Sequence, residues 1–128
     1  MSDPQSFARL FAQAFGTQDA AGLAALFSQD GSLHSLTGRH LEGRRGIEAG
    51  LAEEFAGLSR MARLVTGRTG QQNLGSDVII LHQRFVVTGL RDANGAEMPR
   101  VGALLTAVLA REGNAWLAKA ATFAVVDG

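Results

Sequence analysis

Cysteine is absent from this chain of 128 residues. Disulfide bonds, thiol nucleophiles and cysteine-based zinc sites are therefore excluded. A surplus of either charge is lacking too, because 12 Lys and Arg residues are balanced by 12 Asp and Glu residues. Without a basic surplus, little of the chain can neutralise phosphates, so we expect no nucleic-acid partner.

Long apolar runs are also missing. No stretch approaches the roughly 20 consecutive apolar residues of a membrane span, and no Lys- and Arg-rich amphipathic segment favours a membrane surface. The first residues, MSDPQSFARLF, carry the early acidic Asp3 and no apolar run of the length found in a signal peptide. We therefore expect a soluble cytoplasmic protein without a membrane partner.

What is present is enough apolar material for one core, since 46% of the residues are hydrophobic. Neither repeats nor linkers nor low-complexity segments interrupt the chain. A length of 128 residues is common for one domain, so we expect a single domain over residues 1–128.

Three helices are expected in the first half. In the first, apolar residues three and four positions apart form one stripe: Phe7, Leu10, Phe11, Ala14 and Phe15. Asp19 is a suitable N-cap for a second helix over Ala20–Phe27. The third helix has apolar residues at four-residue spacing: Ile47, Leu51 and Phe55.

Strands are expected where the apolar period changes to two. Asp30 and Gly31 form a predicted turn, and two short strands follow it, from Ser32 and over Arg39–Glu42. Glycines at positions 67 and 70 indicate a bulge or a bend in the first of the later strands. Four long antiparallel strands complete the prediction: Met61–Gln71, Val78–Thr88, Pro99–Ala110 and Trp116–Val126.

Two of the long strands, VIILHQRFVV and VGALLTAVLA, are apolar on both faces, so both faces of their sheet must be covered. Three helices can cover only one face. We therefore expect the other face to pack against a second copy of the chain, in an isologous homodimer.

The order of these elements, with FSQDGSLHSLTG ahead of GRRGI, resembles the nuclear-transport-factor-2-like (SnoaL-like) superfamily, and within it the SgcJ/EcaC branch of mostly unassigned function. The resemblance spans nearly the whole chain and depends on the order and spacing of several features: Asp19 before LAALF, Asp30 with TGR, Gly43-Arg44 with Ile47, LHQRFVVTG, and the strand that starts at Trp116. It implies an α+β, cystatin-like cone, in which three helices pack on a curved, mostly antiparallel sheet of about six strands around a pocket.

Ketosteroid isomerase belongs to this superfamily and uses an Asp base with an oxyanion hole made of a Tyr and a protonated Asp. The resemblance places the base at Ser35, the Tyr at Phe11 and the second acid near Leu105 or Thr106. None of these residues can fill its role, and the chain has no tyrosine at all. We therefore expect no isomerisation by that mechanism. The missing tyrosines also argue against scytalone-dehydratase-like chemistry.

His34 and Ser35 are neighbours on a strand, so their side chains should point to opposite faces and cannot form a dyad. Ser35 is either a hydroxyl in the pocket wall that orients a ligand or a small filler under the first helix. For His34 we favour a position on the surface or at an interface.

His82 and Arg84 share a strand face with apolar residues, where they are costly unless paired or partly wet. Either Arg84 anchors an anionic ligand with His82 as acid or base, or both residues pair with carboxylates or carbonyls. In the family that the chain resembles, a histidine at the position of His82 is usual, whereas the position of Arg84 more often holds an aromatic residue.

The last strand should place Trp116, Ala118, Ala120, Thr122 and Ala124 on one face, and Leu117, Lys119, Ala121, Phe123 and Val125 on the other. Related sequences tend to carry Gln or His near Thr122 and Asn where this chain has Phe123. Thr122 is therefore a candidate ligand contact, while the neighbouring polar group has become apolar.

No metal site and no cofactor are predicted. His34, His40 and His82 are the only histidines, and strand parity does not place His34 and His40 in an obvious pair. No P-loop and no Gly-rich dinucleotide motif is present. A basic cluster, Arg39, His40, Arg44 and Arg45, is either solvated surface with nearby glutamates or the rim of a pocket for an acidic ligand.

Our preferred hypothesis is a homodimer that binds a small, mostly apolar or amphipathic molecule, whose polar or anionic end lies near Arg84 or Ser35. It predicts a closed apolar pocket lined by Phe11, Phe15, Ser35 and Thr122. A second hypothesis is an isomerase, dehydratase or cyclase for a polyketide-like or steroid-like substrate, with His82 facing the pocket as base. A third is an interaction module with a collapsed pocket, whose sheet face binds a different protein.

Overall fold

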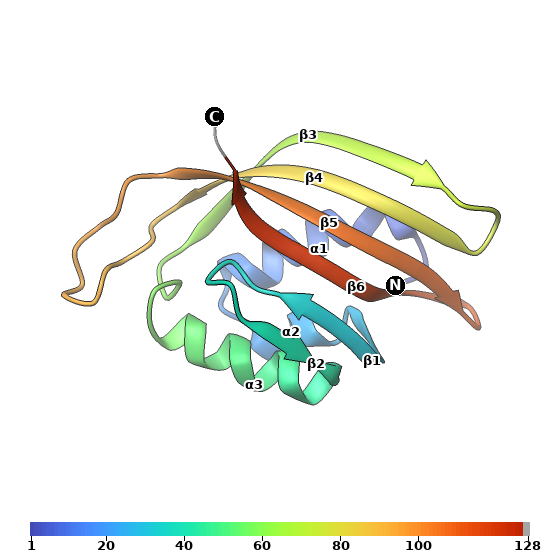
Figure 1. Cartoon of the computed structure of the whole chain (residues 1–128), viewed down its shortest axis with the longest axis horizontal. Coiled ribbons are helices and arrows are strands. Elements are labelled where there is room, and N and C mark those ends of the chain that lie inside the picture. The colour runs from blue at the N-terminus through green and yellow to red at the C-terminus, as the bar shows by residue number, and fades with distance from the viewer. Residues whose placement is uncertain (127–128) are drawn as a thin grey trace.

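The computed structural model describes residues 1–126 (Figure 1). A short 3₁₀ turn, Pro4–Ser6, precedes three helices: α1 (Phe7–Gly16), α2 (Ala20–Ala24) and α3 (Gly43–Ala56). Six strands complete the fold: β1 (Phe27–His34), β2 (His40–Glu42), β3 (Arg63–Asn73), β4 (Val78–Thr88), β5 (Val101–Glu112) and β6 (Ala115–Val126). Of the described helices, none is long and apolar enough to cross a membrane.

The six strands form one sheet in the order β2-β1-β6-β5-β4-β3. All neighbouring strands are antiparallel except β1 and β6, which are parallel. Figure 1 shows α1 running behind the long, curved strands and α3 lying beside the short β1–β2 pair. The expected α+β cone with a mostly antiparallel sheet is thus confirmed.

The core lies between α1 and the inner face of the sheet. The predicted apolar stripe of α1 is confirmed, because four of its five residues are buried: Phe7, Phe11, Ala14 and Phe15. On β4 and β5 buried residues alternate with partly exposed ones, which is the pattern of a sheet with one covered face. Each large side chain buried in this way contributes about 1.5–3 kcal/mol.

The second helix is shorter than expected. Asp19 caps it as predicted, since its Oδ1 accepts from the Gly22 amide at 2.8 Å. The helix ends at Ala24 rather than Phe27, because the Leu26 carbonyl already accepts from the Ala118 amide of β6. Phe27 therefore begins β1, and Asp30-Gly31, which we expected to be a turn, lies within that strand at an irregularity.

A bulge in β6 changes which residues share a face. Ala118 lies opposite Leu109 of β5, whereas Ala120 lies opposite Val108. Lys119 is therefore the extra residue of the bulge, without an opposite residue on β5. Strand parity reverses at this point. Of the bulge or bend predicted for β3, the structure shows a bulge, between residues 66 and 69.

The expected grouping of the β6 residues is therefore wrong on one side of the bulge. Trp116 and Ala118 are buried on the inner face together with Ala121 and Phe123. Thr122 is exposed on the outer face. Simple alternation places Trp116 and Thr122 together, and the extra residue between them separates them.

An ion pair and a close backbone approach hold the irregular parts of β1 and β6 together. The Lys119 Nζ donates to Asp30 Oδ1 at 2.6 Å, and Ser28 Oγ donates to the same oxygen at 3.0 Å. The lysine and then the serine hydroxyl hold the pKa of the Asp30 carboxyl below its usual value. At Gly31, an added Cβ would lie 2.8 Å from the Ala118 carbonyl oxygen, so the strands can approach only with glycine there.

We expect Gly31→Ala to lower the free energy of unfolding by about 1–3 kcal/mol, because the methyl group would push β1 from β6. The measurement is urea denaturation of the purified variant. Gly46→Ala on α3 is the matched control, since its added Cβ meets nothing within 4 Å and alanine favours a helix, by up to about 1 kcal/mol. Equal effects of the two changes would contradict the close approach.

Candidate functional site

Aromatic rings fill the space inside the curved sheet where we expected a pocket. Phe11 and Phe15 of α1 meet Phe123 of β6 edge to face, with ring centroids 5.3 and 5.6 Å apart. Phe55 of α3 packs on Phe15 at 5.2 Å, and Phe85 of β4 lies 6.0 Å from Phe123. All five rings are buried. Two of the predicted pocket residues, Phe11 and Phe15, are therefore part of the hydrophobic core.

Ser35 faces the interior and His34 the exterior, so the predicted opposite orientation of these neighbours is confirmed. Ser35 is 4% exposed, and its hydroxyl already has partners, because it accepts from the Arg39 amide at 3.3 Å and shares a hydrogen bond with Thr37 Oγ1 at 3.1 Å. Its backbone carbonyl accepts from the amide of Gly38, which has a φ of 86°. In this structure Ser35 closes the turn between β1 and β2.

Two buried polar groups at the end of α3 were missed by the sequence analysis. Glu54 is 9% exposed and Ser59 is 1% exposed, and Glu54 Oε2 and Ser59 Oγ have no hydrogen-bond partner within residues 1–126. The sequence does contain a signal for Glu54, because it lies three positions after Leu51 and seven after Ile47, on the apolar stripe of the helix. A carboxylate on an apolar helix stripe is costly and therefore informative.

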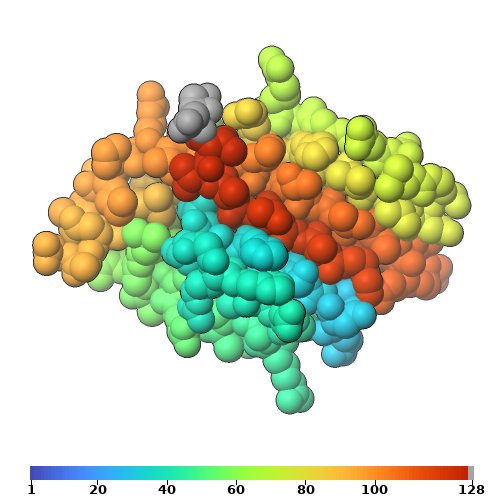
Figure 2. Space-filling view, in the orientation of Figure 1, coloured from blue at the N-terminus to red at the C-terminus, as the bar shows by residue number. Residues whose placement is uncertain are grey.

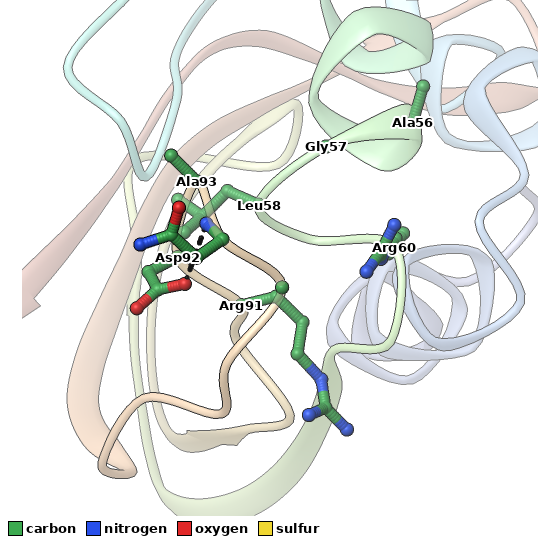
Figure 3. Close-up of a pocket in the computed structure, with 9 residues that line it drawn as sticks. Ala56, Gly57, Leu58, Arg60, Arg91, Asp92 and Ala93 are labelled. Carbon is green, nitrogen blue, oxygen red and sulfur yellow. Dashed lines mark hydrogen bonds between the residues drawn. The ribbon is translucent and has the colours of Figure 1, made fainter.

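The segment that follows α3 forms a cleft of about 610 Å³ with the turn between β4 and β5 (Figure 3). Arg60 and Arg91 line it, and the Asp92 carboxylate accepts from the Asn94 and Ala96 amides at 2.9 Å. The carboxylate therefore holds the turn. Few apolar side chains line this cleft, which makes it a poor match for the apolar ligand we expected.

The outer face of β4–β6 is not covered by helices, and Figure 2 shows it from outside. A polar row crosses this face at right angles to the strands: His82 lies opposite Thr106, Thr106 opposite Thr122, and Thr122 beside His34 of β1. The His82 Nδ1 lies 3.4 Å from Thr106 Oγ1. The row divides the face into two ends.

His82 and Thr122 consequently lie on the opposite side of the sheet from Phe11, Phe15 and Ser35. The four residues predicted to line one closed pocket do not line a common space, because the bulge in β6 turns Thr122 outward. The enzyme hypothesis required His82 to face the interior, and the structure places it outside. His82 and Arg84 do share a face with apolar residues, as strand alternation predicts.

One end of the outer face is aliphatic. Its side chains come from three neighbouring strands and lie in adjacent register positions: Val78 and Ile80 of β4, Val108 and Ala110 of β5, and Leu117 and Ala120 of β6. All six are partly exposed. Uncovered apolar side chains that are contiguous in this way are typical of an interaction surface.

The other end is a depression of about 630 Å³ with three arginines around it, Arg68, Arg84 and Arg100. Its apolar lining comes from the ends of three strands: Val86, Val101, Gly102, Val125 and Val126. Within residues 1–126 no arginine of this set forms an ion pair. The sequence singles out Arg84 as one possible anchor for an anionic ligand, and it does not single out Arg68 or Arg100.

The bulge in β3 brings Arg68 to this depression. The Gln83 side chain, 2% exposed, donates from Nε2 to the carbonyls of Gly67 at 3.2 Å and Arg84 at 2.8 Å, and its Oε1 accepts from the Thr69 hydroxyl. A buried glutamine thus supplies hydrogen bonds to backbone groups that the interrupted ladder leaves free. Arg68 could not be placed from sequence because its position depends on this register shift.

The predicted basic cluster is largely engaged elsewhere. Arg39 forms an ion pair with Glu53 at 2.9 Å, and Arg44 donates to the Phe27 carbonyl at 2.6 and 3.0 Å. His40 lies directly opposite His34, contrary to our expectation from parity, with stacked rings 4.3 Å apart. Over the described part of the chain, no group of three or more His, Cys, Asp or Glu side chains is arranged to hold a metal ion.

Solved structures with the same arrangement confirm the fold. An uncharacterized protein with a cystatin-like fold from Caulobacter vibrioides superposes with a TM-score of 0.86 at 17% identity, over 96% of this chain and 87% of that chain. An NTF2-like protein with a cystatin-like fold from Novosphingobium aromaticivorans gives 0.75 at 20% identity, over 96% and 79%. The protein Aln2 from a Streptomyces species gives 0.72 at 21% identity, over 94% and 86%.

The chain therefore has the cystatin-like fold of nuclear-transport-factor-2-like proteins, as the sequence resemblance implied. At these identities the likeness describes the fold alone. No protein-family model and no curated protein matches the chain in sequence.

We expect Glu54→Met to raise the free energy of unfolding by about 1–3 kcal/mol, because it removes a buried acceptor without a partner and keeps the side-chain length. Urea denaturation measures the effect. Glu53→Met is the control, since Glu53 is an exposed neighbour whose pair with Arg39 contributes at most about 1 kcal/mol. A clear loss of stability in Glu54→Met would contradict the view that this buried carboxylate destabilises the fold.

Proposed function

We propose that the protein binds a small amphipathic anion on the outer face of its sheet, with the anionic end held by Arg68, Arg84 and Arg100. The observation that carries this proposal is the depression of about 630 Å³, in which three arginines without an ion pair in residues 1–126 surround an aliphatic lining. Its volume lies in the range of ordinary ligand sites.

The chemistry of the depression selects the ligand class. Guanidinium groups hold carboxylates, sulfates or phosphates by charge-assisted, often bidentate hydrogen bonds. The valine side chains beside them favour an alkyl or ring portion through burial of apolar area. A molecule with both parts gains from both interactions, whereas a neutral molecule of the same shape gains only from the second.

The support for catalysis is weaker. The roles of base and oxyanion donors in ketosteroid isomerase would fall on Ser35, which closes a turn, and on Phe11, which is packed in the core. His82 is on the outer face beside Thr106 and forms no ion pair within the described residues. A binding role is consistent with a filled interior and does not require a general base.

We further propose that a second copy of the chain covers the aliphatic end of the outer face. Strands β4–β6 present contiguous apolar side chains there, and all three helices lie on the other side of the sheet or beside it. A self-complementary patch of this kind suits a two-fold, isologous contact. The polar row separates this patch from the arginine depression, which would lie at the margin of such a dimer.

We expect decanoate to bind the purified protein at least tenfold more tightly than decanol, and Arg84→Gln to weaken decanoate binding about tenfold, since a charge-assisted hydrogen bond is worth about 1.5–3 kcal/mol. Isothermal titration calorimetry measures both. Arg111→Gln is the control, because Arg111 pairs with Asp77 and stacks on Trp116 far from the depression. Equal binding of decanoate and decanol, or an unchanged affinity in Arg84→Gln, would contradict the proposal.

We expect the wild-type protein to be a dimer at micromolar concentration and Val108→Glu to be a monomer, because the new charge would lie in the middle of the aliphatic end. Light scattering coupled to size-exclusion chromatography gives the masses. The control is Met61→Glu, at an exposed side chain outside the sheet. A monomeric wild type, or a dimer that persists in Val108→Glu, would contradict a dimer contact on this face.

A further inference from the structure

His34 and His40 form a facing pair at the end of the β1–β2 hairpin. They are directly opposite each other in the antiparallel ladder. The Ser35 amide donates to the Arg39 carbonyl at 2.8 Å, which makes the neighbouring His34–His40 position a non-hydrogen-bonded pair. Such pairs bring the two Cα atoms to about 4.5 Å, the closest cross-strand spacing of side chains.

The two imidazole rings are parallel, with centroids 4.3 Å apart and an interplanar angle of 2°. Both residues are exposed. Neither ring makes a hydrogen bond within residues 1–126. Within the same residues, His40 has one acidic neighbour, Glu42, whose Oε1 lies 3.6 Å from the His40 Nε2. That distance is too long for a good hydrogen bond, so the ring nitrogens remain available as ligands.

One acidic side chain lies beside the pair. Glu42 is on the same face of β2 as His40 and is largely exposed. The basic side chains nearby are held elsewhere: Arg39 by Glu53 at 2.9 Å, and Lys119 by Asp30 at 2.6 Å. The Glu42 carboxylate, whose recorded contact is the 3.6 Å approach to His40, is therefore beside the two rings.

We propose that His34 and His40 together bind a divalent transition-metal ion. In the stacked arrangement the in-plane lone pairs of the two rings run parallel, so each ring must rotate out of the stack before one nitrogen of each can reach the same ion. Both side chains are exposed and have room to rotate, and water can complete the coordination shell. Imidazole is a common ligand for Zn²⁺, Cu²⁺ and Ni²⁺, with which it forms stronger complexes than with Mg²⁺ or Ca²⁺. This site is separate from the arginine depression, and its test does not depend on the anion proposal.

The test is a calorimetric titration of the purified chain with NiCl₂ in a buffer that does not bind metal. We expect one ion per chain, and a loss of affinity of at least tenfold in His34→Ala and in His40→Ala. His82→Ala is the matched control, because His82 is the third histidine of the chain and lies on the same face of the sheet as His34, with β5 and β6 between their strands. We expect it to change the affinity less than twofold.

Folding of each variant is checked by circular dichroism, and because both rings are exposed, neither substitution removes a contact of the core. MgCl₂ in place of NiCl₂ should give no measurable heat of binding, since a hard cation prefers oxygen ligands. An equal loss in all three histidine variants would overturn the proposal, because the binding would not then depend on the pair. Retention of wild-type affinity in His34→Ala or in His40→Ala would also overturn it.

Discussion

The packing of phenylalanine rings inside the curved sheet is the interaction on which the rest of the molecule depends. Phe11 and Phe15 of α1, Phe55 of α3 and Phe123 of β6 meet at centroid distances between 5.2 and 6.2 Å. These contacts fix α1 against the sheet and α3 against α1, and they occupy the volume in which we expected a pocket. Groups that can contact a ligand are therefore found at the rim of the core or on the outer face.

Irregularities in the strands then decide what the outer face contains. The extra residue at Lys119 turns Thr122 outward and keeps Trp116 and Phe123 together in the core. The shift in β3 places Arg68 beside Arg84. Both features are bulges held by polar side chains, Asp30 in the first case and Gln83 in the second. The regular parts of the sheet form the core, and the irregular parts position the candidate ligand contacts.

Most of the fold could be predicted from the sequence, because helical and strand periods are local properties of the chain. The stripe of α1, the Asp19 cap and the strand Val78–Thr88 all appear as expected. The site was harder to predict, because it depends on register. Alternation along one strand gave the orientation of His34 and Ser35 correctly, but it could not reveal the extra residue at position 119. Whether His34 and His40 face each other depends on the length of the connecting turn and on the Ser35 hydrogen bonds that close it.

The buried Gln83 has a consequence for how copies of this chain can meet. Strand β3 is the last strand of the sheet, so its outer backbone groups could template a further strand from another molecule. The bulge that Gln83 stabilises breaks the regular spacing of those groups at Gly67 and Arg68 and adds a charge there. Growth of the sheet from molecule to molecule is thereby discouraged at this edge.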